Sequence, residues 1–555
     1  MNLLGCLSSE YEVEKVTVPI SILDEGINDI KDYFIKVREG EVEFVISKIC
    51  DHAGGRLIKK GDLAICPMHG WKLNLNELHY TDSHVCKERI PFDLNEGEIV
   101  VCGSREKIFN SFKNKHDNNK VIFRWLNHAT VYFEYNGVSL ITDPWLFGPA
   151  FVTGWWLADP SPKDSIDLLN KADFVFISHN HPDHLHSETL AELDKEKKII
   201  VADFQTRSTE KFLRYLGFKN IISLKFKDVW ELAPGFQVCI LKSGDFRDDS
   251  GIYLSINGVD FVLTVDANYL NSNVLPENID FLFTSFAGGA SGFPLCFNDY
   301  DQEEKLAIVN RNRIAMRMQV LNYIKATKPT YYVPYAGMFK EYAKRDIYIN
   351  EHNLKNTIED FETICIQNSV QLLSPSSLDL FEVSQNSLKR IKLSREMFGT
   401  EDTEAYIGKL KMDYKWNGSK VINYLQKSDY HDNLYLQLIP TDDDFNPIGE
   451  IVVADFKKSK FYLDIFSNIV RSIDDVQVSS FFIRSEVLMC IIENSLPWED
   501  MSIGFQMRVS RHPNRYESKF WYYFTNEYIA NSHFRFSSFC GACNMIDQNP
   551  VWHKV

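Results

Sequence analysis

A short apolar run followed at once by a cluster of histidines constrains the fold of this chain more than any other feature. Residues 174–177 read FVFI, and residues 178–186 read SHNHPDHLH. An apolar run of this length is typical of a buried strand. The loop after it carries four potential metal ligands: His179, His181, Asp183 and His184. A histidine-rich surface loop is the alternative, but this spacing directly after a strand favours a metal site.

The loop resembles the metal-binding motif of the metallo-β-lactamase superfamily, whose members mostly cut bonds with water and usually use zinc. Upstream, residues 125–145 read WLNHATVYFEYNGVSLITDPW and resemble the opening strands of that superfamily. The resemblance implies an αββα fold around the motif. It places His128 and Asp143 near strand ends, where we favour supporting or structural roles over metal binding. His186 lies just outside the motif, and we do not expect it to be a ligand.

A dinuclear zinc hydrolase needs more metal ligands further along the chain, and this sequence offers only part of that set. Asp266 directly follows the strand-like segment 261–265 and is the expected bridging carboxylate. The position of the first downstream histidine instead reads SGDFRDD (243–249), and the usual Pro-x-His reads PYAG (334–337). Both downstream histidines are therefore missing from these positions. Asp245 is either a carboxylate replacement or an exposed loop acid.

This ligand set changes the expected chemistry. His179, His181 and Asp266 offer two imidazoles and one carboxylate with open positions, a set that suits non-haem iron(II) and O2. Asp183 and His184 complete an alternative set or a second metal position, with Asp266 shared. These five residues are our candidate catalytic and metal-binding residues.

The N-terminal part of the chain carries a second group of metal ligands. Residues 50–71 read CDHAGGRLIKKGDLAICPMHGW. Four ligand side chains come in two pairs: Cys50 with His52, and Cys66 with His69. One thiolate and one imidazole from each of two loops is the ligand pattern of a Rieske [2Fe–2S] centre, and CPMHGW fits that family. Structural zinc and an empty fold are the alternatives. Such a cluster carries single electrons, so it implies an electron donor and an acceptor site.

A Rieske segment followed by a metallo-β-lactamase-like segment resembles the CMP-N-acetylneuraminate hydroxylase family, monooxygenases that convert an N-acetyl group on a nucleotide sugar to N-glycolyl. Five further stretches look like that family: DPWLFGPAFVTGWWL (143–157), FAGGASGFP (286–294), VPYAGMF (333–339), DDDFNP (442–447) and IGFQMRVSRHP (503–513). The likeness extends to about residue 525. The chain departs from the family near Phe246, where the family has a histidine. Bacterial relatives include enzymes that act on UDP-linked muramic acid, so the resemblance leaves the exact nucleotide sugar open.

The resemblance implies cofactors and partners. It implies a [2Fe–2S] cluster, a non-haem iron that uses O2, and electrons from a reduced carrier, either a cytochrome b5-like protein or a ferredoxin, with its reductase. Trp155 and Trp156 are candidate contacts for the nucleotide sugar, although tryptophans more often belong to a core or an interface. Gly288, Gly289 and Ser291 lie in a glycine loop whose backbone can approach a phosphate or a sugar; a simple turn is the alternative.

We expect a multidomain chain. A polar stretch at 113–120 and the sequence SPSS at 374–377 mark the two boundaries. The expected parts are an all-β Rieske domain over residues 1–112, an αββα metallo-β-lactamase-like catalytic domain over 113–385, and a C-terminal accessory α+β region over 386–555. A long helix is expected from about Asp301 to Ala326, because apolar residues recur there at helical spacing.

The composition argues against several other classes of protein. With 60 basic and 76 acidic residues the net charge is −16, which disfavours a nucleic-acid partner. No apolar run reaches the roughly 18 residues needed to cross a bilayer, so we expect a cytoplasmic protein without membrane insertion. The 11 cysteines are spread over a long chain, which argues against a disulfide scaffold. Cys540 and Cys543 are expected to be buried thiols rather than metal ligands.

Two other functions are open at this point. One is a metal-dependent hydrolase of the lactamase superfamily with an attached electron-transfer domain, in which zinc would supply hydroxide near neutral pH. The missing histidines and the Rieske loops count against it. The other is an electron carrier or redox sensor without catalysis of its own.

Overall fold

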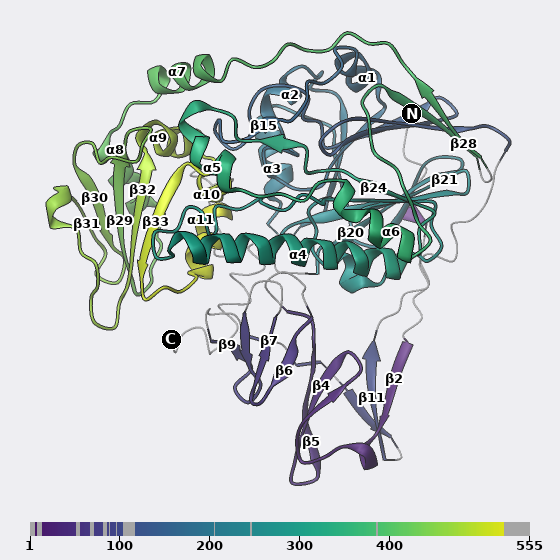
Figure 1. The fold of residues 1–555 in the computed structure, drawn as a ribbon, viewed down its shortest axis with the longest axis horizontal. Helices are drawn as coiled ribbons and strands as arrows, with labels where there is room; N and C mark the ends of the chain where they lie inside the picture. Colours follow the sequence, from purple (N-terminus) through teal and green to yellow (C-terminus); the bar gives the residue numbers. More distant parts are fainter. Residues whose placement is uncertain are drawn as a thin grey trace.

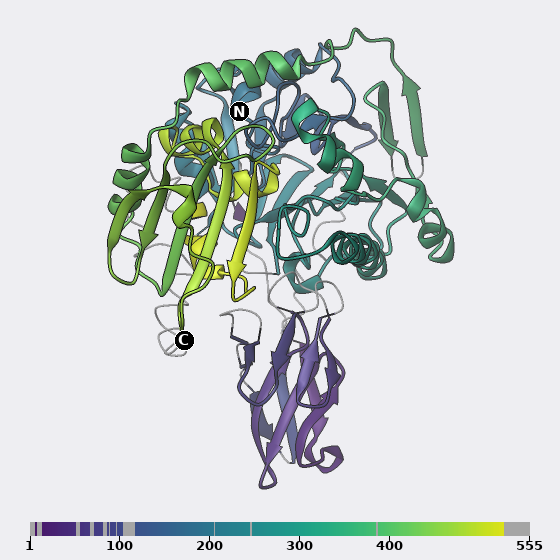
Figure 2. The same ribbon diagram turned by 60° about the vertical axis from the view of Figure 1, so that its left-hand side comes forward.

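The structure is a computed structural model. It describes residues 6–7, 14–50, 56–66, 71–81, 86–87, 89–90, 92–95, 97–103, 117–204, 206–244, 247–384 and 387–526. Figure 1 shows an N-terminal region built from strands beneath a larger body of sheets and helices. Figure 2, turned by 60°, shows the same separation. It also shows the C-terminal sheet, in light green and yellow, beside the central part of the body.

Two eight-stranded sheets form the centre of the larger body. The first has the strand order β1 (Cys6–Leu7), β19 (Val229–Ala233), β20 (Phe236–Lys242), β21 (Ser250–Ile256), β22 (Val259–Leu263), β23 (Phe281–Thr284), β24 (Tyr331–Pro334) and β26 (Gln371–Leu372). The second has the order β18 (Ile221–Leu224), β17 (Lys198–Ala202), β16 (Phe174–Ile177), β14 (Val138–Thr142), β13 (Thr130–Tyr135), β12 (Val121–Asn127), β27 (Asp379–Ser384) and β28 (Ser387–Lys392).

The two sheets pack face to face and bury one large apolar cluster. It takes Phe123 and Phe176 from one sheet and Phe261 and Phe283 from the other. All four residues of β16 are buried, as expected for a strand covered on both faces. The predicted strand at 174–177 is therefore confirmed.

Helices cover the outer face of each sheet. Leu169, Leu190 and Leu213 pack on the second sheet, and they come from α1 (Ser165–Lys171), α2 (Ser187–Ala191) and α3 (Ser208–Tyr215). Val320 and Cys365 pack on the first sheet, and they come from α4 (Gln302–Thr327) and α6 (Glu362–Gln367). This layering confirms the predicted αββα fold.

Helix α4 is the long helix predicted from about Asp301 to Ala326. Its N-cap is Asp301, whose side chain accepts a hydrogen bond from the backbone N–H of Glu304 while Glu304 bonds back to the cap. This capping box satisfies backbone donors that a helix start otherwise leaves unpaired.

The N-terminal region consists of three small sheets. They are β2 (Glu14–Pro19) with β11 (Glu98–Gly103) and β10 (Phe92–Asn95); β3 (Gly26–Ile30), β4 (Tyr33–Arg38) and β5 (Glu41–Ser47); and β6 (Ile58–Lys60), β7 (Leu63–Ile65), β8 (Lys72–Asn74) and β9 (His79–Tyr80). Phe34, Phe44 and Leu73 share one buried apolar cluster. Apart from one short 3-10 helix, Ile20–Ile22, the regular elements described in this region are strands.

The C-terminal part has one five-stranded sheet with helices. The strand order is β31 (Lys460–Asp464), β30 (Ile451–Asp455), β29 (Leu434–Thr441), β32 (Gln477–Arg484) and β33 (Met507–His512). The helices are α7 (Thr403–Asp413), α8 (Gly418–Lys427), α9 (Ser485–Glu493), α10 (Glu499–Ile503) and α11 (Ser518–Asn526). The α+β character expected for this part matches what is described.

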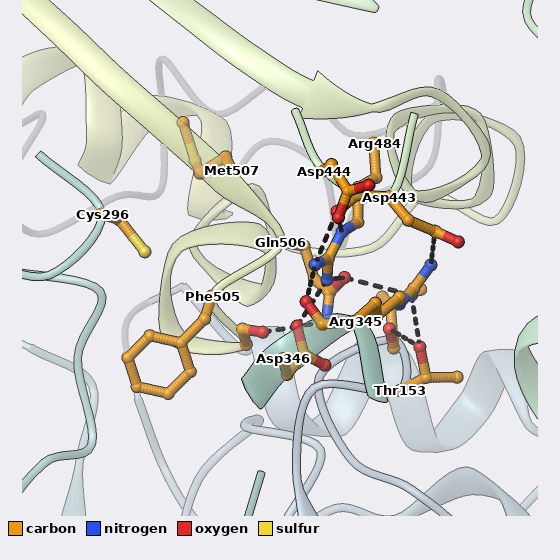
Figure 3. Close-up of polar contacts among 12 residues, drawn as sticks. Thr153, Cys296, Arg345, Asp346, Asp443, Asp444, Arg484, Phe505, Gln506 and Met507 are labelled. Atoms are coloured by element: carbon orange, nitrogen blue, oxygen red, sulfur yellow. Dashed lines mark hydrogen bonds and ion pairs between the residues drawn. The ribbon is translucent and has the colours of Figure 1, made fainter. Parts of the chain in front are cut away.

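Buried ion pairs join the C-terminal sheet to the αββα part (Figure 3). The Arg484 guanidinium donates to Asp346 Oδ1 at 2.6 Å, and Arg345 Nη1 donates to Glu486 Oε1 at 2.6 Å. Arg345 and Asp346 lie at the start of α5 (Ile347–His352), whereas Arg484 and Glu486 lie at the junction of β32 and α9. Gln506 Oε1 accepts hydrogen bonds from both arginines. These contacts fix the C-terminal sheet against the αββα part.

Two pairings cross the predicted domain boundaries. Strand β1, in the predicted N-terminal domain, pairs with β19 of the first large sheet. Strand β28, beyond the predicted boundary at residue 385, pairs along its whole length with β27. The second large sheet therefore continues to Lys392. Among the described residues, no helix combines the length and apolar character that a membrane crossing requires.

Candidate metal centre

The histidine loop begins where β16 ends, and its neighbours arrive from adjacent strand ends. Strand β14 runs parallel to β16, so Asp143, directly after β14, lies beside Ser178, directly after β16. Asp143 Oδ1 accepts a hydrogen bond from the backbone N–H of Ser178 at 2.7 Å. Asp266 follows β22 in the opposite sheet. The site thus lies at the edge where the two sheets face each other.

The His179 and His181 rings face each other through His179 Nε2 and His181 Nδ1. The Ser178 hydroxyl donates to Asp143 Oδ2 at 2.8 Å and lies 2.9 Å from His179 Nδ1, so it accepts from that nitrogen. This assigns the lone pair of His179 to Nε2. His181 donates from Nε2 to Glu499 Oε1 at 3.0 Å, so its Nδ1 faces the lone pair of His179. These two nitrogens are 2.8 Å apart. At this distance either a proton on His181 Nδ1 or a bound cation must lie between them.

His184 is oriented in the same way. Its Nδ1 lies 3.1 Å from Asp143 Oδ2 and donates to it. Its Nε2 faces Asp183 Oδ2 at 3.3 Å and Asp266 Oδ2 at 3.4 Å. A metal-binding histidine usually donates its other ring nitrogen to such a partner. Asp143 is therefore placed to orient the His184 ring.

Two further side chains lie among these donors, although the sequence offers no histidine at the two downstream positions. Asp249, directly before β21, has its Oδ1 4.0 Å from His179 Nε2. His128, between β12 and β13, has its Nε2 3.2 Å from Asp183 Oδ2. Both residues are buried. The sequence favoured a supporting or structural role for His128 over metal binding, whereas the structure places its donor atom within 4.8 Å of those of Asp183 and His184.

Three overlapping groups of donor atoms can hold a metal ion, each with its atoms within 4.8 Å of one another, in the part of the chain that the structure describes. The groups are His179, His181 and Asp249; His128, Asp183 and His184; and His179, His184 and Asp266. All five residues predicted from the sequence thus come together. The groups share His179 and His184, which is the arrangement expected for two adjacent metal positions.

The charges in the site favour a bound cation. Burial lowers the pKa of His181, but the charge and hydrogen bond of Glu499, together with the charges of Asp249 and Asp183, raise this pKa to about 9. Burial likewise opposes ionisation of Asp183, yet His184 and His128 hold the pKa of this carboxyl well below its usual value. Asp183 Oδ1 is buried and makes no hydrogen bond to any described residue. A metal ion would satisfy this oxygen, so the residues present fit one.

Sequence reasoning missed Asp249 and Glu499. Asp249 lies in the stretch SGDFRDD that replaced a histidine, but the candidate acid chosen there was Asp245. Asp245 and Phe246 lie outside the described residues. No local signal marked Glu499, which begins α10 and lies 318 positions from His181 in the sequence.

The predicted cluster ligands are described in part. Cys50 and Cys66 are 0% and 1% exposed and belong to the same buried apolar cluster. The backbone N–H of Cys66 donates to the carbonyl of Trp71 at 2.8 Å, which closes the loop between them. His52 and His69 lie outside the described residues, as do Cys540 and Cys543.

The predicted substrate contacts differ in their surroundings. Trp155 and Trp156 are 1% and 0% exposed, and the Trp155 indole N–H donates to the Ile503 carbonyl at 3.0 Å. This burial favours a structural role for both. Gly289 lies against the Asn353 side chain, whereas a side chain at Gly288 would meet open space. Ser291 is exposed, and its hydroxyl accepts from the Phe293 N–H.

The fold and the site together define a metallo-β-lactamase-like metal domain. Residues 123–260 match the family model described as "Beta-lactamase superfamily domain". Solved structures with some likeness include CmlA, a diiron β-hydroxylase from Streptomyces venezuelae, at a TM-score of 0.33 and 15% identity over 50% of this chain and 55% of that chain. Another is an isothiocyanate hydrolase from Delia radicum gut bacteria, at a TM-score of 0.33 and 14% identity over 47% of this chain and 98% of that chain.

Nearly the whole chain is similar to curated proteins named cytidine monophosphate-N-acetylneuraminic acid hydroxylase. The protein from Danio rerio is 28% identical over 91% of this chain and 92% of its own length. The protein from Mus musculus is 28% identical over 91% of this chain and 94% of its own length. The protein from Asterias rubens is 29% identical over 85% of this chain and 77% of its own length. The resemblance predicted from the sequence is confirmed. Because these relatives are hydroxylases, the prediction of an enzyme of the oxidoreductase class is confirmed as well.

Proposed function

We propose that this chain is an O2-dependent monooxygenase that hydroxylates the N-acetyl group of a nucleotide sugar, CMP-N-acetylneuraminate or a similar compound, to N-glycolyl. The observation that carries the proposal is the similarity to named hydroxylases over about nine tenths of the chain. The donor groups of the metal centre support it, because they combine imidazoles with several carboxylates, a mixture that suits non-haem iron.

In this proposal the αββα part holds iron. His179, His181 and Asp249 form one position, and His128, Asp183 and His184 form the other, with Asp266 between them. Bound iron would supply the activation of O2, since a methyl C–H bond is too strong for acid–base groups to open. Asp143, Ser178 and Glu499 orient the histidine rings. Asp266 is the most exposed of these donors, with 23% of its side chain accessible, so we assign it to the side of the centre that meets O2 and substrate.

The N-terminal region holds the [2Fe–2S] cluster on Cys50, His52, Cys66 and His69. The two described ligands fit this, because both thiols lie in one buried cluster beside a closed loop. Electrons would come from a reduced cytochrome b5-like protein or a ferredoxin, with its reductase. We propose the corresponding division into a cluster domain, a catalytic domain and a C-terminal accessory region, near residue 112 and just after Lys392, where the second large sheet ends.

The test begins with protein purified without oxygen. We expect a reduced Rieske signal in low-temperature EPR, and iron beyond the two atoms of a [2Fe–2S] cluster, with little zinc. The protein is then given CMP-N-acetylneuraminate, O2 and a chemically reduced carrier, and mass spectrometry should show a product that has gained one oxygen atom. Zinc in the second centre together with O2-independent hydrolysis would overturn the proposal in favour of the hydrolase.

A further inference from the structure

The C-terminal part touches the core of the N-terminal region. Tyr516 packs against the apolar cluster that contains Cys50 and Cys66. Its ring lies 6.2 Å from the ring of Trp71, centroid to centroid. Trp71 directly follows the loop that begins at Cys66, and its carbonyl closes that loop. Tyr516 therefore connects the C-terminal part to the apolar cluster that contains Cys50, Cys66 and Trp71.

The same part of the chain also reaches the metal centre. Glu499, the first residue of α10, accepts the hydrogen bond of His181 Nε2 at 3.0 Å. Helix α10 packs against α11, and Trp498 just before α10 lies 5.6 Å from Phe520 and 4.8 Å from Phe524 of α11, ring to ring. Glu499 directly follows Trp498 and Tyr516 shortly precedes Phe520, so this ring contact holds their two segments together.

Very close backbone contacts hold α10 in this place. A Cβ atom on Gly154 would lie 2.2 Å from the carbonyl oxygen of Gly504, and one on Gly292 would lie 2.4 Å from that of Ser502. Both distances are shorter than real Cβ contacts, so only glycine allows the approach. The Trp155 indole adds its hydrogen bond to Ile503. The stretches 143–157 and 286–294, read in the sequence as family motifs, therefore serve to dock the segment that carries Glu499.

We propose that Trp71, Tyr516, Glu499 and His181 form the electron-transfer connection between the cluster domain and the metal centre, built by the C-terminal part. The connection rests on the proposed function, since it needs the cluster as donor and the iron as acceptor. One electron leaves the reduced cluster and one reaches the iron, while no bond in the four side chains breaks. Glu499 and Tyr516 are positioning residues: the first fixes the His181 ring, and the second closes the gap to Trp71.

The test measures how fast the reduced cluster is reoxidised in three variants: Tyr516→Leu, Tyr516→Phe and Glu499→Gln. Each protein is reduced with dithionite and then mixed with O2 and CMP-N-acetylneuraminate, and the loss of the Rieske EPR signal is timed. His179→Ala gives the background rate of direct oxidation. We expect Tyr516→Leu to slow the loss severalfold, with unchanged EPR line positions and iron content, and Tyr516→Phe to slow it less because the ring contact remains. Glu499→Gln should also weaken iron binding by about 10–100-fold, the range for a ligand's outer partner.

Tyr435→Phe and Glu493→Gln are matched controls in the C-terminal part, and both should behave like the unmodified protein. Tyr435 bonds to Tyr462, and Glu493 pairs with Lys420 at the surface. Full iron content with the unmodified reoxidation rate in both Tyr516→Leu and Glu499→Gln would overturn the connection. An unmodified protein that binds no iron in the second centre would instead overturn the proposed function, so the two failures are distinguishable.

Discussion

At the scale of single residues, the metal centre shows how a lost ligand can be replaced from a different place. No histidine is described after β20 or directly after β24; Asp249 from the loop after β20 lies near His179, and His128 from the opposite sheet lies near Asp183 and His184. A carboxylate in place of an imidazole adds negative charge to the first position. That change favours iron over the neutral three-histidine environment of many zinc sites.

We expect Asp249→Ala and His128→Ala each to reduce the iron affinity of the centre by at least about tenfold, since losing a mere outer partner already costs that much. The measurement is iron per chain after titration against a chelator. His431→Ala is the control, because 64% of the His431 side chain is exposed and it lies outside the three donor groups. Unchanged iron affinity in both variants would remove these residues from the ligand set.

At the scale of elements, helix α10 depends on glycine contacts made by two distant loops. Helix α4, in contrast, depends on its own cap. Helix α10 is thus stabilised by tertiary contacts, and the start of α4 is stabilised locally. A single substitution can test each case.

Gly154→Ala should disturb the docking of α10, because the added Cβ meets the Gly504 carbonyl at 2.2 Å. Overpacking of this kind costs about 1–3 kcal/mol in the free energy of unfolding, and the iron affinity should fall with it. Gly408→Ala is the control: it lies inside α7 with nothing within 4 Å of the added Cβ. It should stabilise the chain by about 0.5–1 kcal/mol. Equal effects of the two substitutions in urea unfolding would contradict the docking role.

Asp301→Ala should lower the free energy of unfolding by about 1 kcal/mol, because the N-terminal donors of α4 lose their acceptor. Asp301→Asn keeps an acceptor oxygen and should cost much less. Urea unfolding of the two variants checks this, and the same loss in both would show that the cap does not act through its hydrogen bond.

At the scale of the whole molecule, the C-terminal part is a connector as well as an accessory. It is fixed to the αββα part by the Arg345 and Arg484 ion pairs (Figure 3), it supplies Glu499 to the metal centre, and it places Tyr516 on the N-terminal core. Three parts that are separate in sequence thus meet around α10 and α11.

Arg484→Met should cost about 3–5 kcal/mol in the free energy of unfolding, because it leaves the buried Asp346 without its ion pair. The Arg484 side chain is fully buried and that of Asp346 is 1% exposed. Lys420→Met breaks an exposed pair with Glu493 and should cost less than about 1 kcal/mol. A loss for Arg484→Met no greater than for this control would show that the buried pair does not hold the parts together.

The sequence by itself determined the features that rest on local pattern. The apolar run before His179 predicted β16, helical spacing predicted α4, and the histidine loop placed four donors at one strand end. The lactamase-like fold was implied by the resemblance of residues 125–145 and 178–186 to that superfamily, whereas the strand and the helix followed from local pattern.

Only the tertiary structure decided how the centre is completed. Asp249, His128 and Glu499 are separated from the histidine loop by long stretches of chain, and no spacing rule links them to it. Their approach depends on which strand ends meet and on how closely α10 can dock, and these are set by packing between sheets and by glycine contacts. Local pattern carries no information about such contacts, so the sequence showed which ligands were missing but not which residues replace them.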